Sequence, residues 1–238
     1  MRRSRAAVRS TFLPFVALSL ASCHAAAQAA ANRLSPEEQR GGWVLLFDGQ
    51  TTAGWRGYQM PAMPSGWTVV DGALTRTGAG GDIITTGQYA SFELALEWKL
   101  APGGNSGVMY RVTEADEWSY RTGPEMQILD DAAHADGLNR LTAAGAAYGL
   151  YAAPPGIVKP VGEWNQARIL VQGNHVEHWL NGVKVVSYEL GSAEWQAKVA
   201  ASKFGAWPGY GRAPRGHIAL QDHGDPVAFR NIKIREIQ

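Results

Sequence analysis

The chain has 238 residues, of which 45% are hydrophobic and 18% are charged, and its formal net charge at pH 7 is +1. Residues 1–22 hold four arginines and no acidic residue, so the chain that follows them carries a net charge of −3. A nucleic-acid-binding protein needs a basic surface, which this part of the chain lacks, so we expect no nucleic-acid partner. After residue 22 no segment is long and apolar enough to cross a membrane.

The N-terminus has the pattern of an export signal, a basic segment followed by the apolar run 12–20. This run ends in Leu20-Ala21-Ser22-Cys23, which resembles the lipobox of bacterial lipoproteins, whose cysteine becomes the lipidated first residue. Cys23 is the only cysteine, so no internal disulfide can form and lipidation is its simplest use. We therefore expect an exported protein, lipid-anchored on the periplasmic side of the bacterial envelope. Cleavage after Ala27-Gln28-Ala29 is the alternative and would give a soluble periplasmic or secreted protein.

Residues 23–40 are predicted to be the lipidated cysteine and an alanine-rich tether. The polar end of this tether, Ser35-Pro36-Glu37-Glu38-Gln39, has residues that start a helix, so one helical turn is expected there. The remainder, residues 41–238, is predicted to be a single domain, because about two hundred residues are enough for a substantial hydrophobic core.

From residue 41 onward the patterns indicate β-structure. Residues 92–100 alternate apolar and polar side chains, which is typical of a strand with one buried face. Residues 168–172, 175–180 and 183–188 read as three further strands, joined by Gly-Asn and Asn-Gly pairs that favour tight hairpin turns.

No long stretch shows helical periodicity, and sheets that lack helices must cover each other. The chain is therefore predicted to be all-β, as a two-sheet antiparallel β-sandwich. Six side chains are expected in its core: Leu94, Leu96, Trp98, Ile128, Val176 and Leu220.

Three predicted strands place polar side chains on a face that need not be core. Residues 104–111 present Arg111, and residues 123–130 present Glu125 and Gln127. In residues 216–224 the apolar side chains of Ile218 and Leu220 lie on one face. The other face carries His217, Ala219, Gln221 and His223. If these strands share one curved sheet, their polar groups converge on a groove that suits a sugar. The alternatives are a solvated outer face and a structural histidine at a strand end.

Two segments are longer than hairpin connections and carry aromatic residues. Residues 132–160 hold Tyr148 and Tyr151, and residues 191–215 hold Trp207. Long ordered loops of this kind often form the walls of a ligand site, although they can also serve only to cap the core. His178, with apolar neighbours on its own face, is expected to be a buried structural histidine.

Several motifs, taken together and in order, resemble the 3-keto-disaccharide hydrolase domain family over residues 41–238. The motifs are Trp43-Val44-Leu45-Leu46-Phe47-Asp48-Gly49, Asn105-Ser106-Gly107-Val108, Glu125-x-Gln127-x-x-Asp130, Gly162-Glu163-Trp164-Asn165, His178-Trp179-Leu180-Asn181-Gly182 and Leu220-Gln221-Asp222-His223-Gly224. The resemblance implies a jelly-roll or concanavalin-like sandwich whose concave face binds carbohydrate, in exported proteins of glycoside-degrading bacteria. A 3-keto-sugar is then the expected substrate, supplied by an upstream glycoside 3-oxidoreductase. On this basis Arg111, Gln127, Gln221, Asn105 and Tyr148 are expected to contact substrate.

The expected catalytic residues are Glu125 and His223. A direct glycosidase needs two carboxylates, but the face of Glu125 continues with Gln127, and Asp130 falls on the opposite face. A 3-keto-sugar does not need that pair, because its carbonyl acidifies the proton on C2 and allows elimination of the C1 substituent, followed by hydration. One of the two residues would be the base and the other the acid, with Arg111 or Gln127 stabilising the enolate.

A non-catalytic, lectin-like carbohydrate-binding lipoprotein is the alternative to this enzyme, and a purely structural sandwich is a third. No cofactor is predicted. No His-x-x-x-His spacing is present, and a divalent ion bound by Asp222 with His223 is left open.

Overall fold

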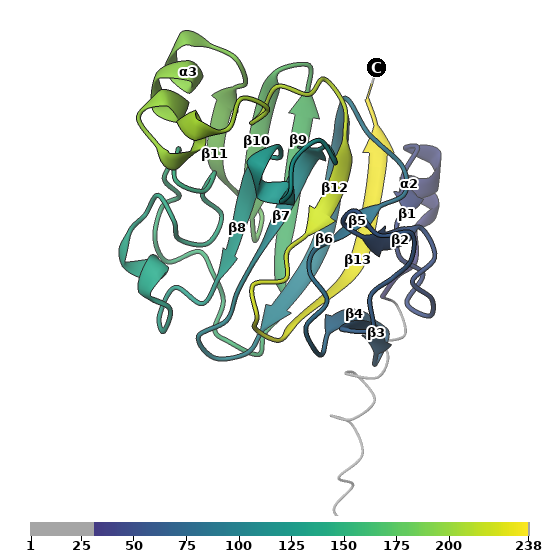
Figure 1. Cartoon of the computed structure of the whole chain (residues 1–238). Helices are drawn as coiled ribbons and strands as arrows, with labels where there is room; N and C mark the ends of the chain where they lie inside the picture. The colour runs from purple at the N-terminus through teal and green to yellow at the C-terminus, as the bar shows by residue number, and fades with distance from the viewer. Residues whose placement is uncertain (1–30, 238) are drawn as a thin grey trace, which may run out of the picture. The chain divides into compact units, whose positions relative to one another are not determined.

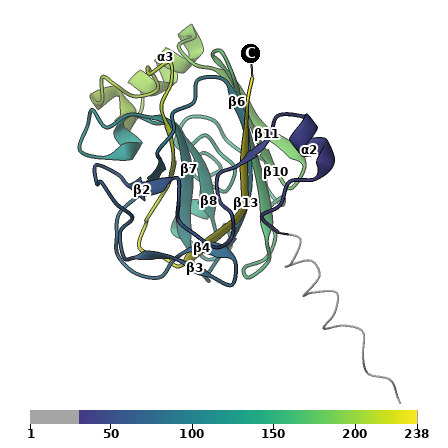
Figure 2. The ribbon, with the colours of Figure 1, turned by 90° about the vertical axis from the view of Figure 1, so that its right-hand side faces the viewer.

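The computed structural model describes residues 31–237, so the predicted signal and Cys23 lie outside the described residues. Two antiparallel sheets pack face to face, as Figures 1 and 2 show. The larger sheet has the order β11-β10-β9-β6-β13-β4-β3, with β1 beside β13. Its strands are β1 (Val44–Leu45), β3 (Trp67–Val70), β4 (Ala73–Arg76), β6 (Phe92–Leu100), β9 (Asn165–Gln172), β10 (His175–Leu180), β11 (Val183–Glu189) and β13 (Val227–Glu236).

The smaller sheet has the order β2-β5-β12-β7-β8. Its strands are β2 (Trp55–Gly57), β5 (Ile83–Thr85), β7 (Asn105–Val112), β8 (Glu125–Leu129) and β12 (His217–Leu220). Every strand pair in both sheets is antiparallel, so the all-β sandwich predicted from the sequence is confirmed.

The core lies between the two sheets, as the strand alternation predicted. On β6 the apolar side chains of Leu94, Leu96 and Trp98 are at most 3% exposed. Ile128, Val176 and Leu220 are buried as well, so all six expected core residues are confirmed. Burying side chains of this size contributes roughly 1.5–3 kcal/mol each, which is the main force that holds the two sheets together.

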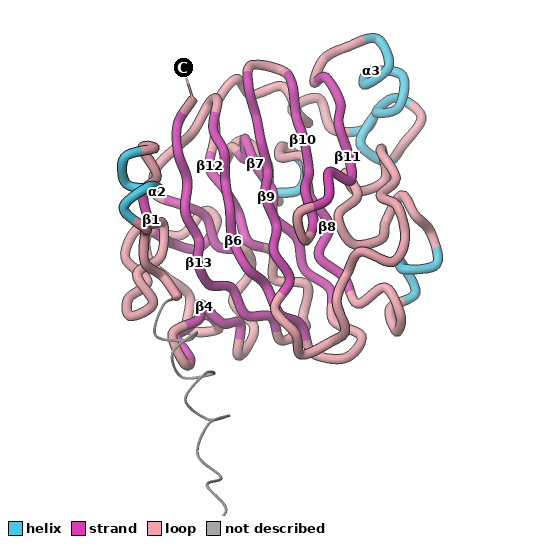
Figure 3. Tube along the Cα trace, turned by 180° about the vertical axis from the view of Figure 1, so that it is seen from behind, coloured by secondary structure: helices cyan, strands magenta, loops and turns pink. Residues whose placement is uncertain are grey.

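The two α-helices of residues 31–237 lie at the rim of the sandwich (Figure 3). α2 (Pro36–Arg40) begins at a capping box, in which Ser35 accepts from the backbone of Glu38 and the Glu38 side chain accepts in return, as expected for the turn predicted there. The second loop holds α3 (Ala193–Ala200) and the 3-10 turn η3 (Lys203–Ala206), which no pattern in the sequence predicted. None of the helices within residues 31–237 is long and apolar enough to span a bilayer.

A bulge between β7 and β12 changes the direction of one predicted site residue. His217 pairs with Val112 and Ala219 pairs with Met109, so two residues of β7 lie opposite the single residue Ile218 of β12. One of the two is Arg111, whose φ of 54° is in the left-handed region. Strict alternation therefore fails at this point, and Arg111 does not follow Met109 onto the outer face.

Candidate active site

The candidate site lies on the outer face of the smaller sheet, the face turned away from the core. Met109 pairs with Glu125 and Gly107 pairs with Gln127, which brings these side chains of β7 and β8 together. Gln221 directly follows β12 and donates its backbone N–H to the carbonyl of Gly107 at 3.0 Å. A pocket of about 420 Å³ is lined by Asn105, Tyr120, Glu125, Gln127, Tyr148, Lys203, Phe204, Trp207, Gln221 and His223. Its size and its mixture of aromatic and polar groups are typical of a small-molecule site.

The carboxyl group of Glu125 occupies the space that a side chain at position 107 would fill. A Cβ placed on Gly107 would lie 2.2 Å from Oε1 of Glu125, far closer than any real contact. The glycine therefore lets the carboxyl lie flat over the neighbouring strand.

Burial dominates the electrostatics of Glu125, which is 8% exposed. Desolvation of the charged form raises the pKa of Glu125 to about 8, with Lys203 opposing the rise and Asp82 and Asp136 adding to it. At neutral pH the protonated carboxyl therefore predominates. A neutral carboxyl of this kind can donate a hydrogen bond or a proton to a ligand.

Three amide side chains around Glu125 present oxygens that have no partner. Gln127 donates its Nε2 to the carbonyl of Thr142 at 3.1 Å, which leaves its Oε1 buried and unpaired. Oε1 of Gln221 and Oδ1 of Asn105 are also buried without a partner. Buried polar groups are nearly always hydrogen-bonded, so three unpaired acceptors in one pocket indicate a ligand that carries several hydroxyl donors.

The two aromatic loops form the walls of the pocket, as predicted. The first loop pairs along the edge of β8, where the backbone N–H of Tyr148 donates to the carbonyl of Glu125 at 3.1 Å. The second loop brings Lys203, whose ammonium lies 4.6 Å from the ring centroid of Tyr148. Lys203 and Tyr120 were not predicted as site residues, because neither lies in a strand whose alternation would assign it to a face.

His223 lies at the mouth of the pocket and is exposed. The ring of His134 lies beside it, with 6.2 Å between the ring centroids. Asp222 does not orient His223, because its carboxylate accepts from Arg76 and from the backbone N–H groups of Gly80 and Gly81. Among residues 31–237 no three His, Cys, Asp or Glu side chains gather closely enough to hold a metal ion.

Arg111 was expected in the groove and His217 on the same strand face as Gln221, and both lie elsewhere. Arg111 donates to the carbonyls of Ala90 and Gly173, and it lines a different pocket. The expectation that it converges with Glu125 is therefore wrong, because of the bulge in β7. His217 is buried, with Nδ1 2.6 Å from the carbonyl of Thr85, and does not share the groove with Gln221.

His178 is the buried structural histidine that was predicted. It is fully buried, and its Nε2 lies 2.9 Å from the hydroxyl of Tyr110. Burial lowers the pKa of His178 to about 4, so its ring is neutral at physiological pH.

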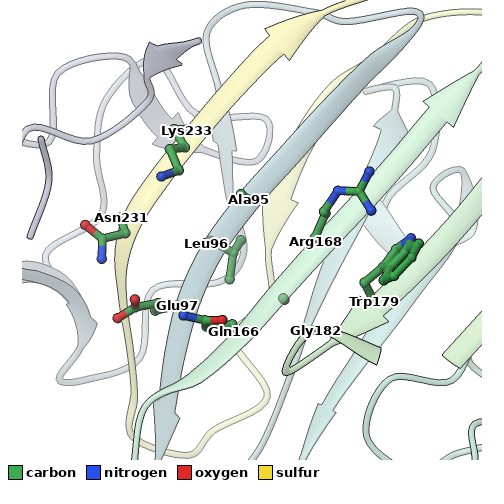
Figure 4. A pocket seen from close by; sticks show the side chains of 10 residues that line it. Ala95, Leu96, Glu97, Gln166, Arg168, Trp179, Gly182, Asn231 and Lys233 are labelled. Carbon is green, nitrogen blue, oxygen red and sulfur yellow. The ribbon is translucent and has the colours of Figure 1, made fainter. Parts of the chain in front are cut away.

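Another hollow, of about 270 Å³, lies on the outer face of the larger sheet, on the other side of the sandwich from the Glu125 pocket (Figure 4). Its charged walls are already paired: Arg168 contacts Glu93, and Lys233 contacts Glu38. Trp179 is covered by Arg168, whose guanidinium lies 4.7 Å from the ring centroid. With its charges satisfied, this hollow is a weaker candidate than the Glu125 pocket.

Known proteins are similar to this chain over most of its length. A family model described as a 3-keto-alpha-glucoside-1,2-lyase-like domain matches residues 42–235. The chain is 37% identical over 226 residues to a 3-keto-disaccharide hydrolase of Bacteroides thetaiotaomicron, and the match covers 82% of this chain and 78% of that protein.

Two crystal structures of predicted glycosyl hydrolases from Parabacteroides distasonis are also similar. One is 35% identical with a TM-score of 0.82 and covers 87% of this chain and 100% of that one; the other is 30% identical with a TM-score of 0.64 and covers 82% and 99%. The family resemblance inferred from the sequence motifs is therefore confirmed. This chain belongs to the family of 3-keto-alpha-glucoside-1,2-lyase-like domains.

Proposed function

We propose that this protein hydrolyses 3-keto-disaccharides by eliminating the C1 substituent and then hydrating the product, with both steps in the Glu125 pocket. The hydrolase name of the Bacteroides relative supports the overall reaction. The description of the family as 1,2-lyase-like supports elimination as its first half. Together they favour an enzyme over the lectin-like alternative.

One observation carries the proposal: Glu125 is the only carboxyl among the described residues that line the pocket. Direct glycoside hydrolysis uses two carboxyl groups, about 5–5.5 Å apart in retaining enzymes and about 6.5–9.5 Å apart in inverting ones. Asp130, the next acid along the strand, accepts from the backbone N–H groups of Gly103 and Ala132 and is held outside the pocket. The pocket therefore supports a route that needs a single carboxyl.

Elimination from a 3-keto-sugar is a route that needs only one carboxyl. A base takes the proton from C2, and the electron pair of that bond forms an enolate with the C3 carbonyl. The enolate then expels the C1 oxygen, which receives a proton from an acid, and leaves a C1–C2 double bond conjugated to the ketone. Water adds its oxygen to C1 and a proton to C2, which yields the free 3-keto-sugar.

The burial of Glu125 and the exposure of His223 favour Glu125 as the acid and His223 as the base. Because Glu125 is mostly protonated at neutral pH, it can donate to the departing oxygen. His223 at the mouth can take the C2 proton. Lys203 takes the role expected of Arg111, since its ammonium lines the pocket where the enolate oxygen would form. The unpaired oxygens of Asn105 and Gln127 would accept from sugar hydroxyls.

The test is to incubate the protein with 3-keto-trehalose and with unoxidised trehalose and to follow release of 3-keto-glucose and glucose. We expect turnover of the keto-sugar alone. A substrate deuterated at C2 should react more slowly if C2–H cleavage limits the rate. In deuterated water the released sugar should carry deuterium at C2, with authentic 3-keto-glucose under the same conditions as the control for exchange after release. Equal activity on trehalose, or product without deuterium, would contradict elimination.

The variants assign the roles. Glu125→Gln and His223→Ala should each lower kcat by at least about 10²-fold, the usual scale for a general acid or base. Arg111 was expected to act on the enolate, but Arg111→Ala should leave kcat within about twofold of the wild-type value in the fraction that folds.

We also propose that the protein acts after export, on a substrate made by a glycoside 3-oxidoreductase.

A further inference from the structure

A second pocket, of about 260 Å³, adjoins the Glu125 pocket on the same face of the sandwich. Tyr120, Gln221 and His223 line both pockets and form the boundary between them. The two pockets therefore lie side by side, and the proposed base, His223, is one of the residues between them. Nothing in the reaction at Glu125 accounts for the second pocket.

A row of aromatic rings connects the two pockets. The ring of Trp118 lies 6.1 Å from that of Tyr120, with 15° between their planes, and Tyr120 lies 5.5 Å from Trp207 in the first pocket. Trp118 is 47% exposed and is the only exposed tryptophan among residues 31–237. Met60, which is 43% exposed, lines the same pocket. Large apolar groups gathered in a hollow indicate a surface that a ligand covers.

Polar groups line the same pocket. Asp82 accepts from the hydroxyl of Ser119 and from the backbone N–H of Asp222, which lies 2.8 Å from Oδ1. The unpaired Oε1 of Gln221 lies at the boundary with the first pocket. An apolar platform together with polar acceptors matches a pyranose ring, which has C–H groups on its faces and hydroxyls around its edge.

We infer that this second pocket binds the sugar that leaves C1, and that Trp118 determines the preference for a disaccharide over a simple alkyl glycoside. The inference rests on the proposed function, which places the keto ring beside Glu125. His223 lies between the pockets, so a base there would reach C2 of the keto ring next to the bond that breaks. The C1 substituent then extends over Tyr120 onto Trp118, in a pocket sized for one sugar ring.

The experiment compares two substrates that share the keto ring, 3-keto-trehalose and methyl 3-keto-α-glucoside. Trp118→Ala should lower kcat/KM for the disaccharide by about tenfold more than for the methyl glycoside, which is the scale of a lost aromatic contact. Trp179→Ala is the matched control. Trp179 lies on the outer face of the larger sheet, on the other side of the sandwich, so this change should alter neither value. Equal losses on the two substrates, or no loss on either, would overturn the inference while leaving the proposed function intact.

A binding measurement keeps the two questions separate. If the wild-type protein cleaves neither substrate, the proposed function fails, and the second pocket is then tested by titrating glucose and following tryptophan fluorescence. We expect glucose to bind the wild-type protein and to bind Trp118→Ala at least about fivefold more weakly. Unchanged glucose affinity, or no glucose binding to the wild type, would show that the pocket does not take a sugar.

Discussion

Replacing Glu125 by glutamine should make the protein more stable at alkaline pH, although it lowers activity. The pKa of Glu125 is raised from 4.5 to about 8 because burial penalises its charged form. The native protein therefore binds this proton more tightly than the unfolded chain does. The stability that this proton contributes is fully present below pH 4.5 and is lost as the pH rises through about 8. Glutamine has nearly the same shape and carries no charge at any pH, so its variant escapes the loss.

The size of the effect follows from the two pKa values. One pKa unit corresponds to about 1.36 kcal/mol, so the difference between 4.5 and about 8 corresponds to at most about 5 kcal/mol. The unfolding free energy of Glu125→Gln minus that of the wild type should be near zero at pH 4.5 and should rise by at most about 5 kcal/mol at pH 9. For a domain of this size that is a difference in Tm of up to about 10–20 °C.

Urea unfolding followed by tryptophan fluorescence at pH 4.5, 7 and 9 measures this difference. Glu38→Gln is the matched control, because hydrogen bonds from Lys233 and from the backbone of Ser35 lower the pKa of Glu38 and no histidine of the described residues contacts it. Its stability relative to the wild type should be lower and should not change between pH 5 and 9. A difference for Glu125→Gln that is constant with pH would refute the account of Glu125 as a buried, protonated carboxyl.

Three further predictions concern activity and location. With Glu125 as the acid, kcat/KM should fall above pH 8. Lys203→Met should move this fall to higher pH, because Lys203 lowers the pKa of Glu125. A rise of kcat/KM through pH 8 would instead make Glu125 the base. Gly107→Ala should lower kcat at least about tenfold by displacing the carboxyl, whereas Gly78→Ala, whose Cβ would have its nearest neighbour 3.8 Å away, should not. Cys23→Ala should release the protein from the membrane fraction; a wild-type protein already in the soluble fraction would show that the lipobox is not used.

The alternation of side chains was enough to predict the sandwich and part of its site. On β6 every second residue is apolar, and the same period placed Glu125 and Gln127 on one face of β8. The capping residues around Ser35 likewise identified α2. These features depend on neighbours a few positions away in the chain, which is why the sequence alone determined them.

Other features depend on contacts between distant segments, and only the tertiary structure decided them. The bulge opposite Ile218 turned Arg111 away from the site, and Lys203 reached it on a loop that has no period. The raised pKa of Glu125 arises because Gly107, on the next strand, leaves room for its carboxyl in a pocket closed by two loops. A local pattern indicates which face of a strand a side chain prefers. It does not indicate a bulge, the path of a loop or the loss of solvent around a side chain, because each of these is set by segments far apart in the sequence.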